Sequence, residues 1–154
     1  MSEHNRWLVE QSLAVDSYQD AAARAALAAD PRAALAAKGV TVPDGVAVTV
    51  LFDDPTHMHV VVPHPGHTFL GALDLPAGLH GVKKLIAATG VKALQEPDFL
   101  GALRQDGAAL ARANVPKLKL TEDHHLIVVE EDASAVRIAV PYVGKAALLR
   151  RVAS

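Results

Sequence analysis

Histidine is the residue type in this chain whose number and spacing could support chemistry. Eight of the 154 residues are histidines, and His57, His59, His64 and His67 lie close together in the sequence. On a strand His57 and His59 would point to the same side, about 6.5–7 Å apart. With His64 or His67 from the following loop they could bind zinc, as in a hydrolytic three-histidine site. The alternative is a set of solvent-facing imidazoles on the polar side of a hairpin.

Other charged clusters favour surface positions over chemistry. Glu130, Glu131 and Asp132 fall at an expected turn, where acidic residues are normally solvated. Lys83 and Lys84 are expected on a solvated helix face, and they are too sparse for a nucleic-acid footprint. The sequence contains no glycine-rich nucleotide loop, no serine-nucleophile elbow and no cysteine. Thiolate ligands and disulfides are therefore excluded.

Composition predicts one globular domain over residues 1–154. Apolar residues make up 51%, charged residues 21%, and the formal net charge is −2. This balance is typical of a folded, water-soluble chain and gives no general reason to bind nucleic acid or acidic lipid. Glu10 interrupts any export signal near the start, and no apolar run approaches the roughly 18 residues of a membrane span. We expect a cytoplasmic protein.

The elements that would position the histidines begin with a stretch that occurs twice. Residues 46–63 read as two strands joined by a tight turn at 53–56, and residues 124–141 repeat the pattern 78 positions later. Alternation places large apolar residues on one face of both copies. These residues are Val48, Val50, Met58, Val60 and Val62 in the first copy, and Leu126, Val128, Val136, Ile138 and Val140 in the second.

Helices and loops are expected around these hairpins. The expected segments are N-terminal helices over 6–29, a helix starting at Asp30-Pro31 and ending at Gly39, a Pro- and Gly-rich junction over 64–78, helices over 79–89 and 97–113, a short strand at Leu118 and Leu120, and a C-terminal tail over 144–154. Gly90 is expected to stop the helix over 79–89.

The predicted fold class is α+β, with two αββ repeats over about 30–63 and about 97–141. Because an isolated hairpin with one helix buries little surface, both units are expected to share one antiparallel sheet with helices on its apolar face. Chance similarity between two αββ units is the alternative to a repeat, since apolar alternation recurs for physical reasons alone.

A family resemblance supports this fold. The segments Asp30-Pro31-Arg32-Ala33-Ala34-Leu35, 39–46 (GVTVPDGV) and Val60-Val61-Val62-Pro63 resemble the nitrile hydratase α subunit, the related thiocyanate hydrolase γ-like fold, and the nitrile-hydratase-like leader peptides of ribosomal natural-product precursors. The resemblance covers about residues 27–66, and more loosely about 103–144. It implies a nitrile hydratase α-like scaffold.

The resemblance does not extend to the family's metal site. That family holds iron or cobalt in a cysteine claw directly after the second hairpin, where this chain reads Val140-Pro141-Tyr142-Val143-Gly144-Lys145. Without thiolates the soft ligands for such an ion are missing. We therefore expect a non-catalytic binding or assembly module that works with a protein partner or as a homo-oligomer, with no cofactor. A histidine-ligated zinc hydrolase and a structural subunit of a larger complex are the alternatives.

Overall fold

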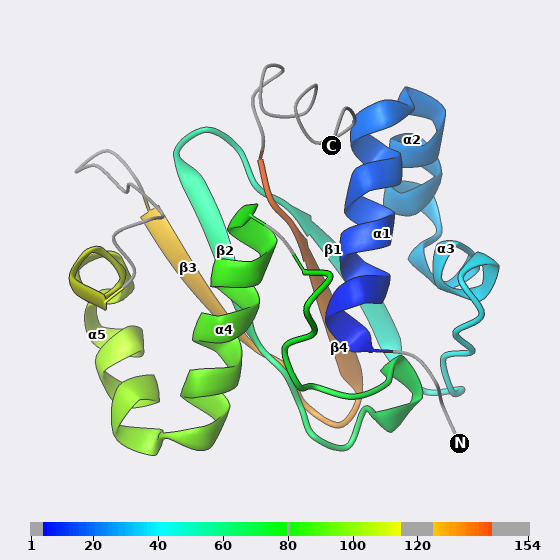
Figure 1. Cartoon of the computed structure of the whole chain (residues 1–154). Helices are drawn as coiled ribbons and strands as arrows, with labels where there is room; N and C mark the ends of the chain where they lie inside the picture. Colours follow the sequence, from blue (N-terminus) through cyan, green and yellow to red (C-terminus); the bar gives the residue numbers. More distant parts are fainter. Residues whose placement is uncertain (1–4, 80, 115–124, 143–154) are drawn as a thin grey trace.

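The computed structural model describes residues 5–79, 81–114 and 125–142, which form a mixed α+β fold (Figure 1). The expected short strand at Leu118 and Leu120 and the tail over 144–154 lie outside these residues. The elements in chain order are α1 (Arg6–Gln19), α2 (Ala21–Ala29), α3 (Pro31–Ala37), β1 (Ala47–Phe52), β2 (His57–Val62), the 3-10 helix η1 (Thr68–Leu70), α4 (Gly81–Gln95), α5 (Pro97–Asn114), β3 (His125–Glu130) and β4 (Ala135–Val140).

Aspartates divide the N-terminal helices. The expected helical stretch 6–29 is broken at Asp20, whose extended backbone ends α1 and whose side chain accepts the amide of Ala22 at 2.9 Å to begin α2. Asp30 does the same for α3, accepting the amide of Ala33 at 3.1 Å, with Pro31 in the first turn as predicted. Gly39 follows α3 with φ of 84°, the left-handed conformation expected there.

Gly90 does not end a helix, so this prediction is wrong. Helix α4 continues through it to Gln95. A Cβ atom at Gly90 would lie 2.2 Å from the carbonyl oxygen of Val61 in β2, so glycine here lets the helix cross the strand backbone at close range.

The predicted helix 97–113 is present as α5 but bends at Asp106. The backbone there has φ −153° and ψ 81°, close to the −145° and 80° of Asp30. The Asp106 side chain accepts the amide of Ala109 at 3.0 Å, as Asp30 does for Ala33. The second part of α5 therefore begins in the same way as α3.

The four predicted strand segments are confirmed, but their predicted antiparallel pairing is wrong. The two strands of each expected hairpin do not pair with each other. Instead β1 pairs in parallel with β4, in the register Ala47↔Ala135, and β2 pairs in parallel with β3, in the register His57↔His125. The described residues therefore contain two parallel two-stranded sheets, and each takes one strand from either half of the chain.

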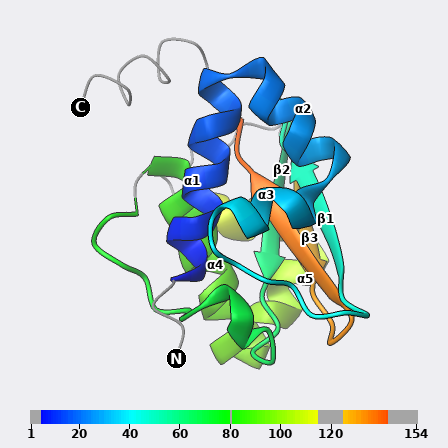
Figure 2. The ribbon, with the colours of Figure 1, turned by 90° about the vertical axis from the view of Figure 1, so that its right-hand side faces the viewer.

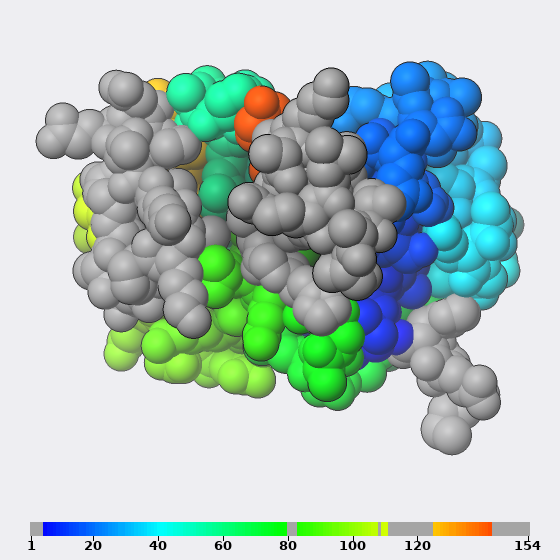
Figure 3. Space-filling model, turned by 45° about the horizontal axis from the view of Figure 1, so that its top comes forward, coloured from blue at the N-terminus to red at the C-terminus, as the bar shows by residue number. Residues whose placement is uncertain are grey.

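Backbone hydrogen bonds at both ends of these sheets correspond at a spacing of 78 residues. The four bonds are Ala47 N–H to Ser134 O, His125 N–H to Thr56 O, Asp53 N–H to Val140 O, and Glu131 N–H to Val62 O. The loop after β1 consequently lies against the end of β4, as the teal and orange atoms show at the top of Figure 3. This pairing of each strand with one from the other half of the chain could not be predicted from the alternation of apolar residues. Alternation assigns each strand a buried face but does not identify the neighbouring strand.

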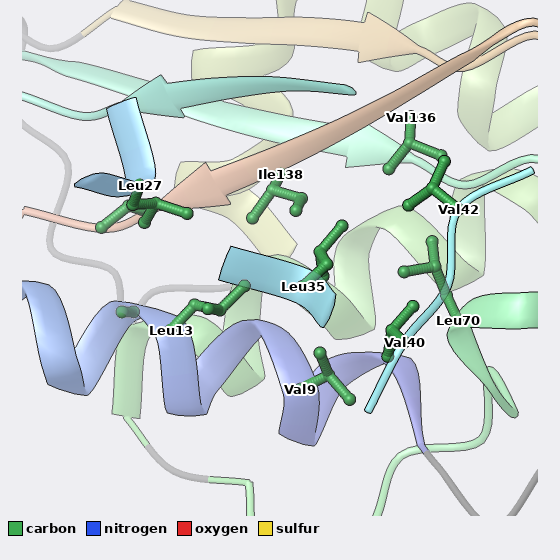
Figure 4. Close-up of a cluster of buried hydrophobic side chains, with 11 residues drawn as sticks. Val9, Leu13, Leu27, Leu35, Val40, Val42, Leu70, Val136 and Ile138 are labelled. Carbon is green, nitrogen blue, oxygen red and sulfur yellow. The ribbon is translucent and has the colours of Figure 1, made fainter. Parts of the chain in front are cut away.

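Each sheet packs its predicted apolar face on a separate set of helices. Figure 2 shows the strands on one side of α1 and α4. The first core joins α1, α2, α3, β1 and β4, and its side chains from α1 point toward Ile138 on β4 (Figure 4). The second core joins α4, α5, β2 and β3 around Val60, Val62 and Leu103. The junction 64–78 packs on α1, where the indole nitrogen of Trp7 donates to Leu73 O at 2.8 Å.

Candidate functional site

Side chains, rather than backbone pairing, fill the space between the two sheets. Strands β2 and β4 lie side by side in Figure 1 but belong to separate sheets. Because the carbonyls of Ser134 and Val140 face β1, the backbone groups of Ala135, Arg137 and Ala139 face the other way. Each of these three residues bonds to a side chain on that side.

Four charged side chains lie between the two sheets, and we name them the central charged cluster: Arg6, Glu10, Lys83 and Glu131. Arg6 is fully buried and donates to both oxygens of Glu131, at 2.6 and 2.5 Å, to Glu10 at 2.7 Å and to the carbonyl of Arg137 at 3.2 Å. Lys83 donates to Glu10 at 2.5 Å and to the carbonyl of Ala139 at 2.9 Å. Two cations and two carboxylates thus neutralise one another in the interior.

Helix geometry positions the cluster. Asn5 caps α1 by accepting the amide of Trp7 at 3.0 Å, and this cap starts the helix immediately before Arg6. Arg6 and Glu10 are four residues apart and therefore share one face of α1. Lys83 approaches Glu10 from α4, while Glu131 follows β3 directly.

Burial and charge act in opposite directions on Glu10. Desolvation raises its pKa, but the attraction of Lys83 and Arg6 together outweighs burial, so the pKa of Glu10 lies below its usual value. The same carboxylates, with desolvation opposing them, raise the pKa of Arg6. Arg6 and Glu10 are therefore charged near neutral pH, and the ion pairs of the cluster hold α1, α4 and the strands together.

Asp53 occupies the position 78 residues before Glu131, but its close charged partner among the described residues is a histidine and not an arginine. One oxygen accepts the amide of His59 at 3.0 Å and lies 2.7 Å from its Nδ1, as Glu131 accepts the amide of Arg137. The other oxygen, Oδ2, is buried and has no hydrogen-bond partner among the described residues. Burial raises the pKa of Asp53, against the opposing effect of His59.

The four histidines predicted as zinc ligands lie at both ends of β2. His57 and His59 begin the strand, and each ring is held by a carboxylate, that of Asp54 at 2.9 Å and that of Asp53 at 2.7 Å. The His57 ring also stacks on His125 of β3, with centroids 5.0 Å apart.

His64 and His67 follow the other end of β2, with ring centroids 5.2 Å apart. Nδ1 of His64 accepts the amide of Gly66. Nε2 of His67 donates to the carbonyls of Asp132 and Ala135, because a carbonyl only accepts. Among the described residues no three His, Asp or Glu side chains are grouped to hold one metal ion. The zinc set thus stays a prediction.

Two surface predictions are wrong. Glu131 was expected at a solvated tip and Lys83 on a solvated helix face, yet both are buried, at 8% and 2% exposure. Each is held inside by an opposite charge that lies far away in the sequence. The spacing of Arg6 and Glu10 is the one local signal that pointed to this cluster.

A groove runs between β3 and the bend of α5, and we name it the β3 groove. Its volume is about 360 Å³. Its lining consists of Leu103, Arg104, Gln105, Asp106, Gly107, His125, Leu126 and Val128. Leucine and valine side chains form the apolar part, while Arg104 is paired with Glu130 of β3 at 2.8 Å.

Comparison of the chain with models of known protein families finds no match, and comparison with characterised proteins also finds none. In the described ranges, no helix has the length and apolar character needed to cross a membrane.

Proposed function

We propose that this chain is a non-catalytic binding module on a nitrile hydratase α-like scaffold, which receives an extended segment of a partner protein along the free edge of β3. The proposal is carried by the outer edge of β3 beside the β3 groove, which no other strand of the described residues pairs with. Among the described residues, β3 pairs with β2 alone.

The backbone of β3 is arranged to accept a further strand. The amides of His125 and Glu131 bond to the β2 side. In a parallel ladder alternate residues face opposite ways, so the N–H and C=O groups of Leu126 and Val128 face outward. Outward backbone groups at the edge of a sheet recognise an extended peptide through its main chain, and neighbouring pockets then select its side chains.

The groove indicates the chemistry of the partner segment. Leu126 and Val128 give its floor apolar character, and Arg104, Gln105 and Asp106 give it a polar rim. The exposed Ile127 adds an apolar side chain on the opposite face of the same strand. A partner strand with an apolar residue at the groove and polar neighbours fits this surface.

The scaffold part of the proposal rests on the resemblance and on the correspondences between the two halves. Strand ends, turn carboxylates and helix caps recur at similar spacings, as the pairs Asp53/Glu131 and Asp30/Asp106 illustrate. Duplication of one unit of a helix and two strands accounts for them with one event. The nitrile hydratase-like leader peptides, which this chain resembles, act by being recognised.

The test compares two exposed apolar residues. Partner proteins are captured on the full chain from its host, and the same capture is repeated with Ile127→Lys and Leu75→Lys. Ile127 is 38% exposed on β3, and Leu75 is 42% exposed on the junction. A lysine on an edge strand opposes strand addition. Ile127→Lys should lose the partner and Leu75→Lys should keep it. In the wild-type complex, amide hydrogen exchange at Leu126 and Val128 should slow. Equal behaviour of the two variants, or unchanged exchange at β3, would contradict the proposal.

A histidine-ligated hydrolase is the second candidate. It is favoured by the carboxylates that hold Nδ1 of His57 and His59, an arrangement common around metal-binding histidines. It needs His64 or His67 as a third ligand. Elemental analysis of untagged protein tests it, because stoichiometric zinc that is lost in His59→Ala would favour the hydrolase over the binding module.

A further inference from the structure

We infer that His57 and His125 form a two-histidine site for a divalent transition-metal ion on the open face of the β2–β3 sheet, with Asp54 as its positioning residue. The inference is independent of the proposed partner binding. It differs from the zinc set expected from the sequence, because the second ligand comes from the other half of the chain.

The strand register brings the two rings together. His57 and His125 are direct partners across the parallel pair β2–β3, so their side chains leave the sheet on the same face, about 4.8 Å apart at the backbone. Their rings lie with centroids 5.0 Å apart and planes inclined by 24°. His59, two residues along β2, faces Ile127 instead and has no such neighbour in register.

Asp54 prepares His57 for coordination. One carboxylate oxygen lies 2.9 Å from Nδ1 of His57 and accepts the backbone amides of Thr56 at 2.9 Å and His57 at 2.7 Å. An acceptor at Nδ1 places the hydrogen there and leaves the Nε2 lone pair for a metal ion.

His64 and His67 each use one ring nitrogen for a hydrogen bond to the backbone. Nε2 of His67 donates to two carbonyls, and Nδ1 of His64 accepts an amide. The His57 side chain is instead 44% exposed, and His125 is also exposed, so water can complete the coordination shell.

Imidazole pairs suit copper(II), nickel(II) and zinc(II), with copper(II) bound most tightly. Two nitrogens that share one ion at about 2.0–2.1 Å lie roughly 3–4 Å apart. The rings are stacked with centroids 5.0 Å apart, so both side chains must rotate until their Nε2 atoms point at the same ion.

Isothermal titration of untagged full chain with copper(II), and separately with nickel(II), tests the site. We expect one ion per chain, bound more tightly for copper(II). His57→Ala and His125→Ala should each lower the affinity more than about tenfold, and Asp54→Asn by about 10–100-fold, the usual effect of losing an orienting partner. His64→Ala is the matched control and should bind like the wild type.

Nickel(II) should also broaden the NMR amide signals of His57 and His125 before others, a readout that does not depend on affinity. Circular dichroism establishes that the exposed-residue variants are folded. Binding that survives both His57→Ala and His125→Ala, binding that falls equally in His64→Ala, or no binding by the wild type would each overturn the site.

Discussion

Arg6 and Lys83 point at the carboxylate of Glu10 from two helices, and water reaches almost none of the three side chains. A buried pair is costly to assemble, so its net contribution to stability is small, but removing one partner leaves the other charge buried without compensation. The central charged cluster is therefore most sensitive to a change that removes one charge and keeps the volume.

Glu10→Gln makes that change. We expect it to lower the free energy of unfolding by about 3–5 kcal/mol, because Arg6 and Lys83 stay buried with one negative charge too few. Urea unfolding near neutral pH measures the loss. Glu130→Gln is the control on the exposed Arg104–Glu130 pair and should lose far less. Similar losses in both variants would show that burial does not set the strength of these pairs.

Asp53 makes the stability of the protein depend on pH. Its folded-state pKa is raised above the usual 3.8, so the unfolded chain releases the proton first and stability is lost as pH rises through the folded pKa. Asp53→Asn has no such proton. Relative to wild type, the variant should become more stable between about pH 3 and about pH 7. Denaturant unfolding of both proteins at both pH values measures this difference in stability. A variant that becomes less stable relative to wild type as pH rises would contradict the prediction.

At the scale of elements, glycine acts differently in the two long helices. Gly90 lies where α4 crosses β2, and a Cβ atom there would collide with the carbonyl oxygen of Val61, whereas a Cβ atom at Gly101 of α5 would meet nothing within 4 Å. Helix propensity alone favours alanine at both positions. Contact with backbone, which cannot rotate away, decides the difference.

Gly90→Ala and Gly101→Ala form a matched pair. Gly101→Ala should stabilise the protein by about 0.5–1 kcal/mol through backbone entropy. Gly90→Ala should destabilise it by about 1–3 kcal/mol, since α4 must move off β2. Thermal and urea unfolding of both variants measure the two signs. Stabilisation by Gly90→Ala would mean that the helix does not lie so close to the strand.

At the scale of the whole molecule, the two halves of the chain are held together because each strand pairs with one from the other half. Sheet β1–β4 and sheet β2–β3 each need one strand from before the junction and one from after it. Each core is likewise built across the halves. Neither half can complete a sheet alone.

Two fragments produced by a cut after Leu79 test this interlocking. Each fragment alone should lack the dispersed NMR spectrum of the intact chain, because its strands have no parallel partner. Mixing the fragments should restore the spectrum. A fragment that folds by itself would contradict this pairing of strands across the two halves.

The intact chain should unfold in one transition, with the same midpoint by fluorescence of Trp7 and by circular dichroism.

The amino-acid pattern alone was enough to predict the four strand segments, their apolar faces and the helix caps at Asp30 and Gly39. These features depend on neighbours within a few residues, through side-chain alternation and backbone geometry. Contacts between distant segments set the pairing of the strands, the passage of α4 through Gly90 and the burial of Lys83 and Glu131. A charged side chain can be buried only when a distant segment supplies the opposite charge. A strand likewise needs a distant segment to supply its hydrogen-bond partners, so neither outcome can be found from neighbouring residues.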